Sequence, residues 1–259
     1  MRRRMPRSSG GMRCGFTAPR PAVRFWPCRV RGALMVVCLW LAGPALAAET
    51  IATARYTDPT TRYPHGVLGD QIEWGSIELT FSDGKHRSFT LPDHLVFEDL
   101  APRVIDVTGD GLPEVIAVES DARQGARLAI YGPQGRMTAT PHIGTRFRWL
   151  APVGAADLNG DGHIEIAYVD RPHLAKTLRI WSFSDGRLTE IAALPGLTNH
   201  RIGEDFISGG LRTCNGQPEL IVASSDWRRI IAVRYDGGWK SQDLGPLKNR
   251  QALVSALNC

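Results

Sequence analysis

The sequence lacks the short motifs that mark several common enzyme classes. It contains no G-x-S-x-G, no H-E-x-x-H, no C-x-x-C and no phosphate-binding Walker loop. It therefore gives no sign of the serine hydrolase, zinc peptidase, dithiol or nucleotide chemistry that those motifs carry. Few stretches show a sustained helical period, which leaves an all-β fold as the expectation. Carboxylates are plentiful, but the sequence does not mark any pair of them as facing a glycosidic bond.

The first 47 residues lack acidic side chains altogether. They contain nine Arg and end in an apolar run, 33–42, followed by a small-residue A-x-A site at 45–47. This order of segments is typical of a secretory signal peptide, and the apolar run is short for a transmembrane helix. We predict that 1–47 is cleaved and that 48–259 forms one periplasmic or secreted domain without a transmembrane segment. An uncleaved anchor is the alternative.

Removal of this leader reverses the sign of the net charge. The whole chain has 31 Lys and Arg against 26 Asp and Glu, and the part after residue 47 has 22 against 26. The basic isoelectric point of the whole chain is therefore no indication of nucleic-acid binding. We expect a mildly acidic, monomeric protein that does not bind nucleic acid.

Cysteine is scarce in the predicted mature chain, which retains only Cys214 and Cys259. An even pair of cysteines in an exported chain favours a disulfide. Two unpaired buried thiols are the alternative.

Two stretches of the chain, 106–114 and 157–165, are versions of each other. Each has oxygen-bearing side chains at positions 1, 3, 5 and 9 and glycine at positions 4 and 6, and each runs into an apolar segment typical of a buried strand. Calcium takes about six to eight oxygen ligands, and the carbonyl at position 7 can add one. The predicted ligands of one or two Ca²⁺ ions are the side chains of Asp106, Thr108, Asp110, Glu114, Asp157, Asn159, Asp161 and Glu165, with the carbonyls of Leu112 and His163.

These loops are not EF-hands, because an EF-hand needs a bidentate Glu at position 12 and a helix on each side. Position 12 is Ala117 in one copy and Tyr168 in the other. The alternative to a metal site is a pair of ordinary polar turns, the commonest use of Asp-Gly and Asn-Gly. If calcium binds, we expect a structural role. The ligands of one loop would fill the coordination shell of the ion and leave little room for a substrate.

The two loops are 51 residues apart, and a degenerate third copy follows at 211–219, where Leu211 and Asn215 replace the acidic residues of positions 1 and 5. Four short strands per period of about fifty residues are typical of a β-propeller blade. Residues 77–84 and 88–91 match the later strands of a further unit, and 251–257 is a candidate for its missing inner strand. We predict four blades, with the ring closed by this C-terminal strand and fastened by Cys214–Cys259.

The D-x-[TN]-G-D-G-x-x-E pattern leading into a strand at this spacing resembles the FG-GAP/VCBS repeat family, which includes integrin α-subunit propellers and many exported bacterial proteins. The resemblance covers roughly 95–245. It implies a β-propeller with calcium in the turn between the first two strands of a blade, on the residues given above. It does not imply any particular biochemical activity.

Ligand-binding candidates lie elsewhere, at the segments that lead into the predicted inner strands. We expect them to meet near one mouth of the central channel, where arginines would hold an anionic group and a tryptophan would stack on a sugar ring. These residues are Arg148, Trp149, His200, Arg201 and Arg250, with His65 on a long connection as a further candidate. The alternative is a ring of salt bridges between blades, formed by Asp99 or Asp205 with a neighbouring Arg. We predict a non-catalytic binding module for a protein or glycan ligand. The alternative is an exported carbohydrate hydrolase or lyase that uses the channel mouth.

Overall fold

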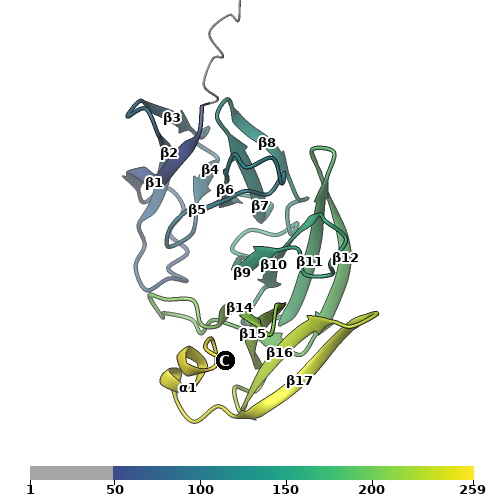
Figure 1. Cartoon of the computed structure of the whole chain (residues 1–259). Coiled ribbons are helices and arrows are strands. Elements are labelled where there is room, and N and C mark those ends of the chain that lie inside the picture. Colours follow the sequence, from purple (N-terminus) through teal and green to yellow (C-terminus); the bar gives the residue numbers. More distant parts are fainter. Residues whose placement is uncertain (1–48) are drawn as a thin grey trace, which may run out of the picture. The chain divides into compact units, whose positions relative to one another are not determined.

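The computed structural model describes residues 49–259, and the predicted signal peptide lies outside the described residues (Figure 1). The described part contains seventeen strands and one short helix, α1 (Arg250–Ser255). The expected all-β class is confirmed. Within residues 49–259, no helix has both the length and the apolar character needed to cross a membrane.

A pattern of four antiparallel strands occurs three times along the chain. In its second occurrence, strands β9 to β12 follow one another in the sheet as they do in the sequence. In the first and third, the opening strand is split into two short pieces that pair with the same neighbour. The first unit comprises β4 (Leu95–Phe97), β5 (Arg103–Ile105), β6 (Glu114–Asp121), β7 (Gly125–Gly132) and β8 (Gly135–Ala139). The second comprises β9 (Leu150–Ala156), β10 (Ile164–Asp170), β11 (Thr177–Ser184) and β12 (Arg187–Pro195), and the third β13 (Leu197–Thr198), β14 (Gly210–Cys214), β15 (Gln217–Ser224), β16 (Arg229–Tyr235) and β17 (Trp239–Pro246).

An N-terminal unit of three strands precedes these repeats. It consists of β1 (Ile51–Thr60), β2 (Glu73–Phe81) and β3 (His86–Thr90), with β2 in the middle. The sequence predicted β2 and β3 but not β1. Trp74 of β2 also pairs with Phe97 of β4, so this unit and the next form one eight-stranded sheet rather than two separate sheets.

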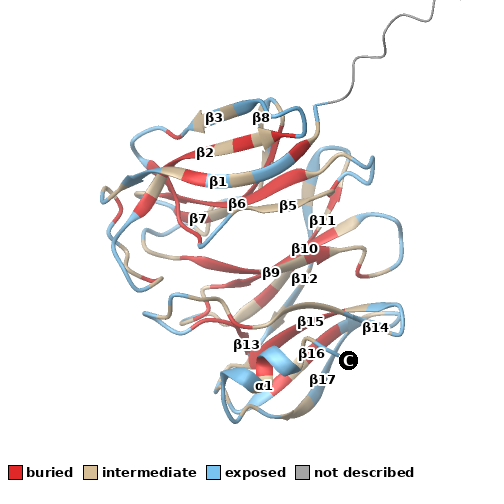
Figure 2. Ribbon diagram, turned by 60° about the vertical axis from the view of Figure 1, so that its left-hand side comes forward, coloured by how far each residue is buried: buried red, intermediate tan, exposed pale blue. Residues whose placement is uncertain are grey.

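The hydrophobic core is divided into layers between neighbouring units. Ile130 on β7 and Ile166 on β10 belong to the layer between the first and second repeats. Ile180 on β11 and Val222 on β15 belong to the layer between the second and third. The middle strands are buried on both faces, and every residue of β6 is buried (Figure 2). Fully burying one aliphatic side chain contributes about 1.5–3 kcal/mol, so these layers hold successive units together.

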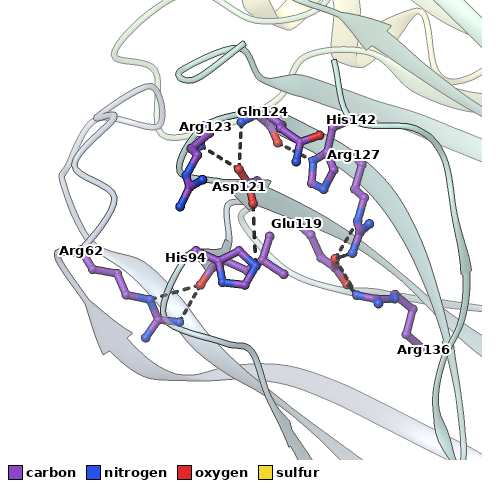
Figure 3. Close-up of polar contacts among 11 residues, drawn as sticks. Arg62, His94, Glu119, Asp121, Arg123, Gln124, Arg127, Arg136 and His142 are labelled. Atoms are coloured by element: carbon purple, nitrogen blue, oxygen red, sulfur yellow. Dashed lines mark hydrogen bonds and ion pairs between the residues drawn. The ribbon is translucent and has the colours of Figure 1, made fainter. Parts of the chain in front are cut away.

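Buried carboxylates on the middle strands are held by arginines of the neighbouring strands. Glu119 on β6 accepts hydrogen bonds from Arg127 on β7 and Arg136 on β8 (Figure 3). In the second repeat, Asp170 on β10 accepts one from Arg179 on β11 at 2.9 Å. Because removal of one partner leaves the other charge buried and uncompensated, these ion pairs help to fix the register of the sheets.

The predicted C-terminal strand is wrong, because residues 250–255 form helix α1 instead. The Asn249 side chain caps this helix by accepting a hydrogen bond from the backbone N–H of Ala252 at 3.0 Å, as is typical of an N-cap. Alanine and leucine favour a helix over a strand, and Leu253 packs against Ile221 and Ala232 of the third repeat. The helix therefore covers the last sheet and does not add an inner strand to the N-terminal unit.

We expect Gly125→Ala to destabilise the fold more than Gly186→Ala. Both glycines have φ near +70° (72° and 73°), where an L residue costs about 1–2 kcal/mol. A Cβ at Gly125 would overlap the carbonyl oxygen of Thr145, whereas the space around Gly186 is open. Urea unfolding measures the free energy of unfolding of both variants. The loss in Gly186→Ala gives the cost of the positive φ alone, and the extra loss in Gly125→Ala gives the cost of the steric overlap. Equal losses of unfolding free energy would contradict this account of the turn.

Candidate functional site

The two predicted calcium loops lie where the resemblance implies, between the first two strands of a unit. The first connects β5 to β6 and the second connects β9 to β10. In both, the Asp at position 1 accepts backbone hydrogen bonds from positions 4 and 6. Asp106 receives them from Gly109 and Gly111 at 2.7 and 2.8 Å, and Asp157 from Gly160 and Gly162 at 2.7 and 3.1 Å. The repeated sequence therefore gives a repeated loop conformation.

The Glu at position 9 is buried under each loop. One oxygen of Glu165 accepts the backbone N–H of Leu158 at 2.9 Å, and Glu114 makes the same bond to Val107 at 3.0 Å. Burial raises the pKa of both carboxyls. The second oxygen of Glu165 is buried without a hydrogen-bond partner, although such groups are normally satisfied. The side chain of Ser182, the residue paired with Glu165 on β11, also acts on this carboxyl, so the second oxygen is a candidate ligand for the loop and not a wholly isolated group.

The donors of the two loops fit calcium in chemical type, since all are oxygens of carboxylate, amide, hydroxyl or carbonyl groups. Their placement is less compact than a closed metal site. In the part of the chain that is described, no three His, Cys, Asp or Glu side chains gather closely enough to hold a metal ion. The aspartates bond instead to the backbone of their own loops, as Asp161 does to His163 at 2.8 Å. Calcium at these loops stays a prediction.

The degenerate third loop is organised by different interactions. Its position-9 residue, Glu219, accepts hydrogen bonds from Arg212 at 2.8 Å and from Arg234 at 3.4 Å. Cys214 in the same loop is disulfide-bonded to Cys259, so the predicted pairing is confirmed. Guanidinium groups and a covalent bond therefore organise the third loop, whereas the acidic groups of the other two loops bond to backbone N–H groups.

The ligand-binding candidates fall into two groups rather than one. His65, Arg148 and Trp149 line the same small cleft, whose volume of about 30 Å³ corresponds to the liquid volume of a single water molecule. Trp149 is 2% exposed and donates its indole N–H to the carbonyl of Glu98 at 2.8 Å. His200 packs edge-on against Trp149. Contrary to expectation, the Trp149 ring is therefore covered and not open to a sugar.

The second group lies between the β13–β14 connection and the start of α1. Arg201 and Arg250 line one pocket of about 120 Å³, together with Lys248. Each guanidinium stacks on an aromatic ring, Arg201 on Trp227 at 4.3 Å and Arg250 on Phe206 at 3.5 Å from the ring centre. Among the described residues, neither arginine forms an ion pair. Their N–H groups are therefore available for an anion.

The sequence did not indicate a third location, which is an acidic pocket beside β2. Glu73, the first residue of β2, lines it together with Asp70, Asp99 and Asp205. Burial and then the charges of Glu98, Asp70 and Asp99 raise the pKa of Glu73 to about 9. No local signal marks this residue, because its neighbours read as an ordinary strand and, apart from Asp70, the other carboxylates come from distant segments.

The architecture and loops define the class of protein, which is an all-β repeat protein with polar loops between the first two strands of a unit. The chain contains an FG-GAP-like repeat, since residues 106–168 match the family model of that description. The match covers both predicted calcium loops. A comparison with curated proteins found no match.

Proposed function

We propose that the protein is an exported, non-catalytic binding module built on a propeller-like array of FG-GAP repeats. In this proposal the three four-stranded repeats and the three-stranded N-terminal unit are its four blades. The FG-GAP-like match and the layered packing of the units support this. The leader-like sequence of 1–47 and the disulfide support export, because disulfides persist in oxidising compartments.

One observation carries the binding role, and it is the pocket of Arg201 and Arg250. Arginine that stacks on an aromatic ring is held in place and keeps its N–H edge open. Two such groups and Lys248 outnumber Glu204, the carboxylate that also lines this pocket, and suit an anionic group such as a carboxylate, sulfate or phosphate. We infer that the module binds a glycan or protein through such a group.

We expect Arg201→Ala and Arg250→Ala each to weaken binding of an anionic ligand by about 10- to 100-fold, because each removes charge-assisted hydrogen bonds worth about 1.5–3 kcal/mol. A glycan array with carboxylated, sulfated and neutral members, together with acidic peptides, identifies the ligand, and calorimetry then measures the loss. Arg187→Ala is the matched control, because Arg187 is exposed on β12 and lies outside the pocket. Equal binding by the wild type and both pocket variants would refute this site.

Calcium has a structural role in this proposal. Asp106, Thr108, Asp110, Glu114 and the carbonyl of Leu112 would hold one ion, and the matching residues Asp157, Asn159, Asp161, His163 and Glu165 would hold another. A bound ion would neutralise the carboxylates and lock each loop against the start of the following strand. The buried second oxygen of Glu165, which has no close hydrogen-bond partner, is the feature that supports this assignment best.

The second candidate function is cleavage of a carbohydrate by a hydrolase or lyase reaction. The acidic pocket is the observation that favours it. A carboxyl that stays protonated at neutral pH, beside others that are ionised, is the arrangement required of a general acid in glycoside cleavage. Glu73 would be the acid. Release of sugar products from a polysaccharide by the wild type, abolished by Glu73→Gln, would support this function over the binding module.

A further inference from the structure

The pocket beside β2 is built from five segments of the described chain. Glu73 and Trp74 begin β2, the connection 61–72 adds three residues, and β1, the β4–β5 connection and the β13–β14 connection supply the rest. The volume is about 340 Å³, and the lining residues are Pro59, Leu68, Asp70, Ile72, Glu73, Trp74, Asp99, Leu100 and Asp205.

Glu73 differs from every other buried acidic residue of the described chain. It is 3% exposed, yet no hydrogen bond or ion pair from the described residues reaches its carboxyl, which faces the pocket. All other buried carboxylates accept at least one hydrogen bond from the protein, namely Glu98, Asp99, Glu114, Glu119, Asp121, Glu165, Asp170 and Glu219. Its oxygens are not among the fully enclosed unpartnered atoms of the described chain, because they open on the pocket. The protein itself offers this carboxyl no partner, so its partner must come from the pocket, as water or as a ligand.

The chemistry of the lining defines that partner. Apart from the indole of Trp74, the polar side chains of the pocket are all carboxyls. An ionised carboxylate can accept hydrogen bonds but cannot donate them. None of the described Lys, Arg or His residues lines it. A ligand that fits must therefore bring donors and positive charge, and an ammonium group has three donors and no acceptor.

The walls select an organic cation over a metal ion. Pro59, Leu68, Ile72 and Leu100 are apolar, and Trp74 adds an aromatic surface of the kind that attracts cations. The carboxylates are too dispersed for a metal, as no metal-holding group of acidic side chains occurs among residues 49–259. The volume is sufficient for an alkyl chain that carries the charge.

We propose that this pocket binds a primary ammonium group on an alkyl chain, with Glu73 as the buried counter-ion, Asp70 and Asp205 at the rim and Trp74 against the chain. The ammonium is either that of a free diamine or that of a lysine side chain on a partner. This site is separate from the arginine pocket and does not depend on it.

Binding of a cation should release a proton. The charged or titratable groups that face Glu73 are Glu98 with its partner His65, Asp70, Asp99 with its partner Arg103, Asp205 and Tyr63. Burial and then the charges of Glu98, Asp70 and Asp99 raise the pKa of Glu73 and keep it protonated at neutral pH, whereas the ligand selects its ionised form. Because alkylamines stay charged up to about pH 10, affinity should rise by about tenfold per pH unit from pH 6 to pH 9.

Calorimetry on the mature protein with cadaverine, Nα-acetyl-lysine amide and its Nε-acetylated form tests the proposal. We expect one or both amines to bind with release of a proton, and the acetylated compound not to bind. Glu73→Gln should weaken binding by about 10- to 100-fold, and Asp205→Asn by several-fold. The control Asp93→Asn makes the same charge change at an exposed position outside the pocket and should change affinity less than twofold.

The two amine probes distinguish a free diamine from a lysine side chain on a partner. Melting curves check that Glu73→Gln and Asp205→Asn remain folded, and Asp205 is exposed enough for its replacement to be tolerated. Failure of both amines to bind at millimolar concentration would overturn the proposal, as would binding that Glu73→Gln leaves unchanged. Polysaccharide cleavage lost in Glu73→Gln would also overturn it, by assigning the pocket to glycoside chemistry.

Discussion

Replacing Cys214 and Cys259 together by serine is expected to lower the free energy of unfolding by about 4 kcal/mol. The disulfide joins residues 45 positions apart, and closing a loop of this length in the unfolded chain accounts for that magnitude. The bond ties the chain end after α1 to the third loop, next to the hydrogen bond from Arg212 to the carbonyl of Ala256 at 2.8 Å. Without it, α1 is held mainly by Leu253 and its apolar neighbours.

Urea unfolding of the mature protein measures this loss, with the oxidised and reduced wild type compared beside the double variant. The reduced wild type is expected to match the variant, because both lack the same constraint. Helix α1 should also exchange its amide protons faster in both. An unchanged unfolding midpoint in the double variant would show that the disulfide does not constrain the fold.

Addition of 10 mM calcium is expected to raise the melting temperature of the mature protein, and a chelator is expected to reverse the rise. Extracellular calcium sites bind with dissociation constants of about 10⁻⁴–10⁻³ M, so this concentration stabilises by about 1.4–2.7 kcal/mol per site. For a chain of this size the shift is about 3–10 °C per site.

Variants in one loop at a time show which loop causes the calcium-dependent rise in melting temperature. Asp157→Ala and Asp106→Ala should each remove part of it, and together they should abolish it. The difference between calcium and chelator is the quantity to compare, since Asp157 also holds Gly160 and Gly162 and its loss destabilises the loop by itself. Asn215→Gly in the third loop is the control, because Asn215 has φ of 53°, which glycine adopts readily. Lack of any calcium response in the wild type would remove calcium from the proposed function.

Sequence reasoning located the repeats because their features are local. Glycines at positions 4 and 6 and an apolar run after position 9 specify a loop followed by a buried strand wherever they occur, and the FG-GAP-like match falls on the same residues. The disulfide was also predictable, since only two cysteines follow the predicted signal peptide. The prediction of a strand in the C-terminal segment was wrong. A short apolar run fits both a strand and a helix until its capping residue and packing partner are known.

The pockets could not be predicted in the same way. Arg201 and Arg250 were expected to share a site with Arg148, but the structure separates them, because Arg148 lies beside the small cleft of His65 and Trp149. Glu73 was not expected at all. Its lack of a partner depends on Pro59, on Asp99 and Leu100, and on Asp205, which come from three other segments and meet at β2 only in the folded chain.

The sequence by itself determined the repeating unit, its polar loops and its all-β character, because hydrogen bonding within a turn and alternation along a strand depend on neighbours in the chain. Only the tertiary structure decided which polar groups are left without partners. That depends on which distant segments meet, as at Glu73 and in the arginine pocket. The two binding sites that we propose arise at those meetings of segments.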